Sequence, residues 1–246
     1  MQYCLASQQT DAELPYPNII GLNEHAAMLH YQHRDTAPPN ELLSLLIDAG
    51  AQVNGYAADV TRTYSLHAGG FSELIEATDK LQQAVCDLVT TGTDYVTLNE
   101  RCHLLLAEML VQFGFVSCSA DTAYEEEVTT AFLPHGLGHL LGLQVHDVGG
   151  HSADRSGAAK SPPDKHPFLR LTRKLEPNMV LTIEPGIYFI QGLLDEFERK
   201  KPGILRHDAI ERFKPYGGIR IEDNVQVKSR GHQNLTREAF SEQGIA

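Results

Sequence analysis

Apolar and polar residues alternate along three stretches of the chain, and a period of two predicts β-strands. The first stretch covers residues 42–64, where two apolar runs flank Asn54 and Gly55. An Asn-Gly pair favours a two-residue type I′ turn, so these runs are expected to form an antiparallel hairpin. Residues 179–189 and 217–227 show similar alternation and predict two further strand segments.

Two other stretches carry apolar residues at helical spacing. The first helix is expected from about Ser72 to Gly92, because a glycine after the last apolar position is a stop signal. The second is expected to open with a capping box of Thr97 and Glu100. The apolar stripes predict buried core faces; they are Leu74, Leu81, Val85, Leu88 and Val89 in the first helix and Cys102, Leu105, Leu106, Met109 and Phe113 in the second.

The segments between these elements decide the fold class. Residues 152–174 are rich in Ser, Pro, Asp and Lys and predict a loop, and residues 191–216 form a charged connection between the later strands. Strands that pair through hairpins, with helices between the pairs, predict an α+β domain rather than a doubly wound parallel sheet.

Composition excludes several classes of protein. The formal net charge of −12 argues against a nucleic-acid partner, because phosphate binding needs clustered Lys and Arg. No apolar run approaches the roughly 20 residues of a membrane helix, and the first residues lack the features of a signal peptide. The four cysteines form no CxxC pair, so we expect reduced thiols in a cytoplasmic protein.

Two aspartates in the hairpin are the first candidate functional residues. A two-residue turn sets the register so that Asp48 faces Thr61 and Asp59 faces Gly50. These four residues then share one face of the hairpin, with the two carboxylates as diagonal neighbours that can converge. Gly50 is expected to leave open space between them.

The later strands each present one acid in the same way. Glu184 and Glu222 alternate with aliphatic neighbours and point away from the apolar face of their strands. A single strand carboxylate is usually solvated, but four in apolar segments indicate a shared site. Converging carboxylates repel one another and have raised pKa values unless cations neutralise them, so the pattern predicts a pair of divalent ions.

Histidines supply a nitrogen ligand for such a site. His135 and His139 are four residues apart, and His146 follows just before Asp147. The intervening glycines argue against a regular helix, so only one of the pair is expected to reach a metal. An oxygen-rich site with one or two imidazoles suits Mn²⁺, with Zn²⁺, Co²⁺ and Fe²⁺ as alternatives.

Four motifs, in this order and spacing, carry a family resemblance: IDAGAQVNGYAADVTRT, HGLGHLLGLQVHD, TIEPGIYF and IRIEDNV. The chain resembles the pita-bread metallopeptidases along essentially its whole length and is most similar to the bacterial Xaa-Pro dipeptidases, or prolidases. The resemblance implies a curved, mainly antiparallel sheet flanked by helices. It also implies a dinuclear metal site whose ligands are Asp48, Asp59, His139, Glu184 and Glu222.

The same resemblance implies an activity, the metal-dependent hydrolysis of Xaa-Pro dipeptides by a metal-bridging hydroxide. Glu184 would transfer the proton, and His146 and His135 would act next to the substrate. His30 would line the substrate pocket. Arg170 would bind the free carboxylate of the C-terminal proline, and Arg220 would orient Glu222 within the substrate site.

The resemblance also bears on the organisation of the chain. Residues 1–246 are expected to form one pita-bread catalytic domain that lacks the N-terminal domain and the first helix of the family. A homodimer is expected for the full-length protein. Two other functions stay open: an organophosphorus triester or anhydride hydrolase on the same site, and a non-catalytic pita-bread module that binds proteins.

Overall fold

The computed structural model describes residues 2–33 and 36–245. Met1, residues 34–35 and Ala246, which the predicted domain includes, lie outside the described residues. The helices are α1 (Gln2–Ser7), α2 (Gly70–Cys86), α3 (Tyr95–Gln112), α4 (Ala120–Glu125), α5 (Val128–Phe132), α6 (Gln191–Lys200), α7 (His207–Phe213) and α8 (Leu235–Glu242), with 3₁₀ turns η1 (Asn23–Ala27) and η2 (Lys214–Tyr216). The strands are β1 (Ile19–Leu22), β2 (Ser44–Ala49), β3 (Gln52–Val53), β4 (Tyr56–Ala57), β5 (Val60–Ser65), β6 (Val180–Ile183), β7 (Gly186–Tyr188), β8 (Gly218–Arg220), β9 (Asp223–Val227) and β10 (His232–Asn234).

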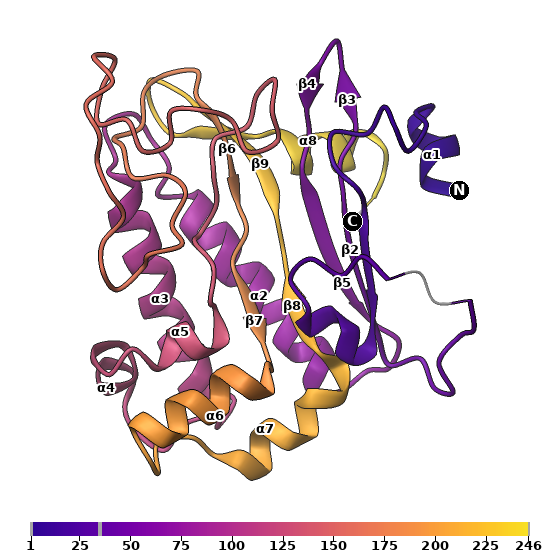
Figure 1. The fold of residues 1–246 in the computed structure, drawn as a ribbon, viewed down its shortest axis with the longest axis vertical. Coiled ribbons are helices and arrows are strands. Elements are labelled where there is room, and N and C mark those ends of the chain that lie inside the picture. The colour runs from indigo at the N-terminus through magenta and orange to yellow at the C-terminus, as the bar shows by residue number, and fades with distance from the viewer. Residues whose placement is uncertain (1, 34–35, 246) are drawn as a thin grey trace.

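The strands form antiparallel groups with helices packed beside them. One three-stranded sheet has the order β1-β2-β5 and another the order β10-β9-β6, and the pairs β3-β4 and β7-β8 extend them. Helix α2 packs against β5, β6 and β8, and α3 packs against α2. Figure 1 shows these strands running side by side through the molecule, with α2 behind them and α6 and α7 at one end. The α+β prediction is confirmed.

The predicted hairpin has the predicted register. Asp48 pairs with Thr61 in the β2–β5 ladder, and the turn residues Asn54 and Gly55 have φ angles of 51° and 83°. Two positive φ angles in succession are the signature of a type I′ turn. The space over Gly50 is not open, however. A Cβ there would clash with the carbonyl oxygen of Ala58 and lie 2.6 Å from a ring carbon of Tyr16.

The helix ends differ from their predicted positions. Helix α2 stops at Cys86, six residues before Gly92, and the side chain of Leu88 is 44% exposed in the turn that follows. Helix α3 begins at Tyr95, and the Asp94 side chain caps it by accepting a hydrogen bond from the backbone N–H of Val96. The predicted capping box is therefore wrong, because Thr97 and Glu100 lie inside the helix.

Each of the later strand segments is interrupted at its acid. Residues 179–189 form β6 and β7 with a break at Glu184 and Pro185, and residues 217–227 form β8 and β9 with a break before Asp223. The predicted loop at 152–174 has no helix or named strand, whereas the charged connection at 191–216 contains α6, α7 and η2.

The main core lies between α2, α3 and the strands β6 to β9. Fully buried residues from α2 and α3, such as Leu74 and Leu106, pack there with Leu181, Ile183 and Ile219 from the strands. All four cysteines are free, as predicted; Cys86 and Cys102 are buried, whereas Cys4 and Cys118 are only partly buried. Among the described residues, no helix combines the length and apolar character needed to cross a bilayer.

Candidate metal centre

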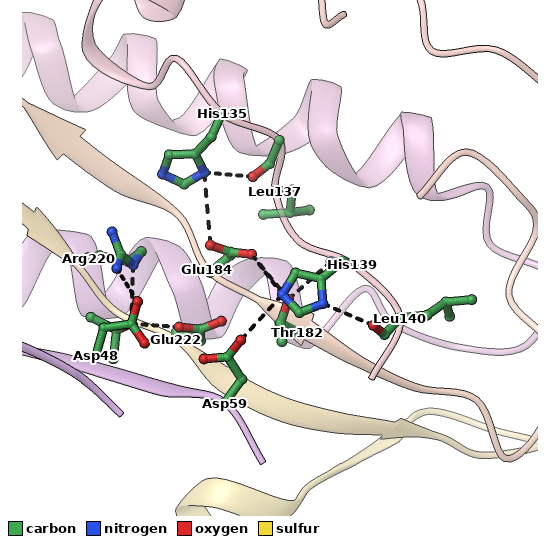
Figure 2. A network of polar contacts seen from close by, with 12 residues as sticks. Asp48, Asp59, His135, Leu137, His139, Leu140, Thr182, Glu184, Arg220 and Glu222 are labelled. Carbon is green, nitrogen blue, oxygen red and sulfur yellow. Dashed lines mark hydrogen bonds and ion pairs between the residues drawn. The ribbon is translucent and has the colours of Figure 1, made fainter. Parts of the chain in front are cut away.

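The four predicted acids meet with His139 on one side of the sheet (Figure 2). Asp48, Asp59 and Glu222 are 7%, 6% and 2% exposed, and Glu184 is partly buried beside them. His139 Nε2 lies 3.4 Å from Asp59 Oδ2 and 3.5 Å from Glu184 Oε1. One ligand atom each from Asp59, His139 and Glu222 lies within 4.8 Å of the others. We call Asp48, Asp59, Glu184 and Glu222 the acid cluster.

Backbone contacts fix the orientation of His139. Its Nδ1 lies 2.9 Å from the carbonyl oxygen of Leu140, and its backbone N–H donates to Thr182 Oγ1 at 3.0 Å. Donation from Nδ1–H to that carbonyl leaves Nε2 as the nitrogen that faces the acids. The close approach depends on Gly138, because a Cβ there would clash with the carbonyl oxygen of Thr182.

Arg220 lies under the acid cluster and is itself buried. Its guanidinium pairs with Asp48 Oδ2 at 2.5 Å and donates through Nε to Thr61 Oγ1 at 3.1 Å. Thr61 Oγ1 in turn donates to Glu222 Oε2 at 2.6 Å. Arg220 thus contacts Asp48 directly and reaches Glu222 through Thr61.

Two tyrosines belong to the site although no sequence pattern predicted a role for them. The Tyr16 hydroxyl lies 2.7 Å from Asp48 Oδ1 and 2.5 Å from Asp59 Oδ1, so it bridges the two carboxylates. The Tyr188 hydroxyl accepts from Arg220 at 2.9 Å and lies 2.9 Å from His135 Nε2. Tyr16 sits between two prolines in a segment that predicted no element, so periodicity could not have found it. Tyr188 belongs to the TIEPGIYF motif, which was its only signal.

Burial and mutual repulsion make the acid cluster difficult to ionise. Burial raises the pKa of Glu222 well above its usual range, and the charges of Asp59, Glu184 and Asp48 raise it further. Burial also raises the pKa of Glu184 to about 7, although His139 and Arg220 act against it. The pKa of Asp48 is raised by burial despite its pairing with Arg220.

Asp59 behaves differently from the other acids. Burial acts to raise its pKa, but the contacts with His139 and Tyr16 and the charge of Arg220 together outweigh burial, and the net pKa is lowered. One arginine and one histidine cannot balance four buried carboxylates. Divalent cations would supply the missing positive charge, and four carboxylates with one imidazole are a donor set that suits them. The residues present therefore fit a metal site.

The acid cluster forms the floor of a pocket of about 210 Å³. Every predicted substrate and catalytic residue lines this pocket, namely His30, His135, His146, Arg170 and Arg220. Burial lowers the pKa of His135 to about 3 and that of His146 to about 4, with nearby positive groups adding to the effect. Both imidazoles are therefore neutral at pH 7 and can donate or accept a hydrogen bond.

A buried carboxylate and histidine cluster beneath a pocket with neutral imidazoles and an arginine is typical of metal-dependent hydrolases. Comparison with known proteins agrees with this class. The sequence profile of "Metallopeptidase family M24" matches residues 1–229. This chain belongs to metallopeptidase family M24.

Curated relatives point in the same direction. The chain is 50% identical over 243 residues to the Xaa-Pro dipeptidase of Xanthomonas campestris pv. campestris strain B100, covering 98% of this chain and 55% of that protein. It is 49% identical to the Xaa-Pro dipeptidase of Stenotrophomonas maltophilia strain R551-3, with the same coverage. The chain thus spans about half the length of the curated relatives it matches.

Solved structures share the fold. Zinc-substituted E. coli aminopeptidase P in complex with product superposes with a TM-score of 0.71 at 28% identity, covering 92% of this chain and 44% of that one. Pseudomonas aeruginosa aminopeptidase PepP gives a TM-score of 0.70 at 28% identity, with coverages of 92% and 45%. These neighbours confirm the predicted pita-bread fold.

Proposed function

We propose that this chain is the catalytic unit of an Xaa-Pro dipeptidase, which hydrolyses dipeptides that end in proline. The observation that carries the proposal is the single pocket in which Arg170 and His30 lie with the acid cluster. An acid cluster alone would suit many hydrolases. A guanidinium in the same small pocket can bind a substrate carboxylate through two parallel hydrogen bonds, which selects a short peptide with a free C-terminus.

The acid cluster and His139 would hold two divalent cations, for which Mn²⁺ is our first candidate and Zn²⁺, Co²⁺ or Fe²⁺ the alternatives. Cations bound there would polarise the scissile carbonyl and make a water molecule nucleophilic near neutral pH. Four observed contacts would keep the ligand side chains in place: those of Tyr16 with both aspartates, of Arg220 with Asp48 and of Thr61 with Glu222.

The chain's own groups would move the proton and hold the substrate. Glu184, whose Oε1 lies 3.5 Å from His139 Nε2, would take a proton from the attacking water and pass it to the proline nitrogen. His135 Nδ1 lies 4.0 Å from Glu184 Oε2, which places a neutral imidazole beside that transfer. His146, whose ring lies 4.4 Å from that of His139, would hydrogen-bond the scissile carbonyl oxygen.

The chemistry of the proline leaving group explains why its hydrolysis needs a specialised site. A bond to proline is a tertiary amide without an N–H, so a protease that recognises that N–H has no donor to bind. The site must then recognise the two ends of the dipeptide. We propose that Arg170 binds the C-terminal carboxylate and that the acid cluster lies at the other end. We propose that the protein acts in the cytoplasm as a homodimer.

Variants of the chain test the assignment. We expect Asp59→Asn and Glu184→Gln to reduce kcat for Ala-Pro by about 10³-fold or more, because each removes a charged group from the reacting centre. Arg170→Gln should mainly raise KM, by about 10- to 100-fold, since the carboxylate contact is made before the reaction. Arg155→Gln, on the same loop but 88% exposed, is the matched control. Ala-Pro turnover by Asp59→Asn, or an unchanged KM for Arg170→Gln, would contradict the proposal.

A further inference from the structure

The two halves of the sheet meet along a seam between β5 and residues 220–224. At the centre of the seam the backbone N–H of Glu222 donates to the carbonyl oxygen of Thr61 at 3.0 Å, as an isolated antiparallel bridge. Two residues further along β5, Thr63 Oγ1 lies 3.1 Å from both the backbone nitrogen and the carbonyl oxygen of Arg220. The Thr63 hydroxyl thus takes the place that a backbone group of β5 would have opposite Arg220. The antiparallel register set by Thr61 and Glu222 continues through this pair.

At the other end of the seam the side chain of Asn224 does the same for Asp59. The backbone N–H of Asp59 donates to Asn224 Oδ1 at 3.1 Å, and Asn224 Nδ2 donates to the carbonyl oxygen of Asp59. Asp59 lies between β4 and β5, outside the ladder that joins β5 to β2. The amide of Asn224 therefore occupies the place that a neighbouring strand would fill.

We call the two hydrogen bonds between the Asn224 side chain and the Asp59 backbone the clamp, and both of its sides are anchored by further contacts. Asn224 is buried, pairs with Thr182 in the β6–β9 ladder, and donates its own backbone N–H to Thr236 Oγ1 at 2.9 Å. On the other side, Asp59 directs its carboxylate to His139 and Tyr16. A rotation of the Asp59 backbone would move that carboxylate relative to Glu222, which lies two residues before Asn224.

We propose that Asn224 is a positioning residue that sets the place of the Asp59 carboxylate in the metal centre. Its amide ties the half of the sheet that carries Asp48 and Asp59 to the half that carries Glu222. This inference rests on the proposed function, because it takes the acid cluster to be a cation site. Groups that orient metal ligands without touching the metal commonly change affinity by 10- to 100-fold.

The test uses the whole chain with Asn224→Leu, which keeps most of the side-chain volume and removes both hydrogen bonds. Asn224→Ala serves as a second variant should leucine prevent folding. Gln226→Ala, two residues further along β9, is the matched control, because its side chain bonds Lys228 rather than the seam. Two readouts are needed: amide hydrogen exchange of Asp59 by NMR in the presence of a chelator, and Mn²⁺ affinity by titration calorimetry.

We expect the Asp59 amide to exchange at least about tenfold faster in either Asn224 variant, while the β5 amides paired with β2 keep their wild-type rates. Mn²⁺ affinity should fall by about tenfold or more, and Gln226→Ala should stay within about twofold of wild type. Unchanged Asp59 exchange, unchanged affinity, or a uniform acceleration of all amides would overturn the proposal. A wild-type chain that takes up none of Mn²⁺, Zn²⁺, Co²⁺ and Fe²⁺ would refute the proposed function, whereas Asp59 exchange would still decide whether the clamp exists.

Discussion

Tyr16 illustrates how one side chain can stabilise two neighbouring carboxylates. Its ring fills the space over Gly50, and its hydroxyl bridges Asp48 and Asp59. The phenol must stay protonated to donate, and burial together with the charges of Asp59 and Asp48 raises its pKa far above the usual range. The hydroxyl has a single proton, which the two carboxylates share, and it adds no charge to the site.

Removing this hydroxyl should destabilise the metal-free protein. Hydrogen bonds to charged groups contribute about 1.5–3 kcal/mol, so Tyr16→Phe should lower the free energy of unfolding by about 2 kcal/mol in urea with a chelator present. The control is Tyr56→Phe, because the Tyr56 hydroxyl donates to the neutral carbonyl of Leu141 at 3.2 Å and is half exposed. Equal losses in the two variants would show that the carboxylates do not depend on Tyr16.

His103 is a buried titratable group away from the acid cluster. Its Nδ1 lies 2.9 Å from Thr129 Oγ1, its ring stacks on His166, and burial lowers its pKa to about 3. The unfolded chain binds a proton at this histidine below about pH 6.5, whereas the folded protein does not do so until about pH 3. Protonation therefore favours the unfolded state throughout that window.

The free energy of unfolding should fall as the pH falls from 6 to 4, by up to about 1.4 kcal/mol per pH unit from His103 alone. His103→Gln, which cannot take up a proton, should show a shallower acid slope by about that amount in urea titrations at successive pH values. His67→Gln changes an exposed histidine and should keep the wild-type slope. A His103→Gln slope equal to that of wild type would contradict the assigned pKa.

Elements of regular structure end where tertiary contacts make ending favourable. Each later strand breaks at its acid, because the backbone turns there to bring Glu184 and Glu222 to the metal centre. Helix α3 begins two residues before the predicted capping residue, because Asp94 caps it and also pairs with Lys160 of the 152–174 loop at 2.7 Å. The Asp94 side chain thus accepts a hydrogen bond from a free N–H at the start of α3 and holds the 152–174 loop through Lys160.

Two substitutions distinguish capping of α3 by Asp94 from the capping box that was expected at Thr97. Asp94→Ala should lower the free energy of unfolding by about 1 kcal/mol, the usual cost of losing an N-cap side chain. Thr97→Ala changes an exposed residue inside the helix and should alter stability by less than about 0.5 kcal/mol. Urea unfolding of both variants measures the difference, and a larger effect at Thr97 would favour the capping box over the observed cap.

At the scale of the whole molecule, a buried ionic network holds the two sheet halves and the last helix together. Asp223, next to Glu222 in sequence, accepts from Arg62 at 2.6 Å and from Arg237 of α8 at 2.7 Å. Gln82 of α2 donates to the same carboxylate at 3.0 Å. These pairings lower the pKa of Asp223 despite its burial. The carboxylate therefore links β5, α2 and α8 directly behind the metal centre.

Neutralising this carboxylate should destabilise the whole fold. Asp223→Asn keeps the shape of the side chain but leaves two partly buried guanidinium groups without their shared anion, which should cost about 3 kcal/mol. Asp195→Asn, which changes an exposed side chain on α6, should cost less than about 0.5 kcal/mol. Urea denaturation with a chelator present measures both. A loss below about 1 kcal/mol for Asp223→Asn would show that the network is not a main source of stability.

The sequence by itself determined the features that depend on short-range chemistry. The Asn54-Gly55 turn and the period of two determined the hairpin register, and with it the shared face of Asp48 and Asp59. Alternation in the later strands marked Glu184 and Glu222, and the four motifs in order marked His139 and the fold family. These signals can be read locally because backbone geometry repeats every two residues in a strand.

Only the tertiary structure decided what holds the site together. Tyr16, Tyr188 and Asn224 meet their partners across 32 to 165 residues of sequence. Tyr16 stands in no periodic pattern, and the alternation around Tyr188 and Asn224 does not identify their partners. The start of α3 was decided in the same way, because Asp94 caps the helix and also pairs with Lys160 of a distant loop. A hydrogen bond between distant segments depends on how the sheet halves pack, and the order of residues along the chain does not encode that packing locally.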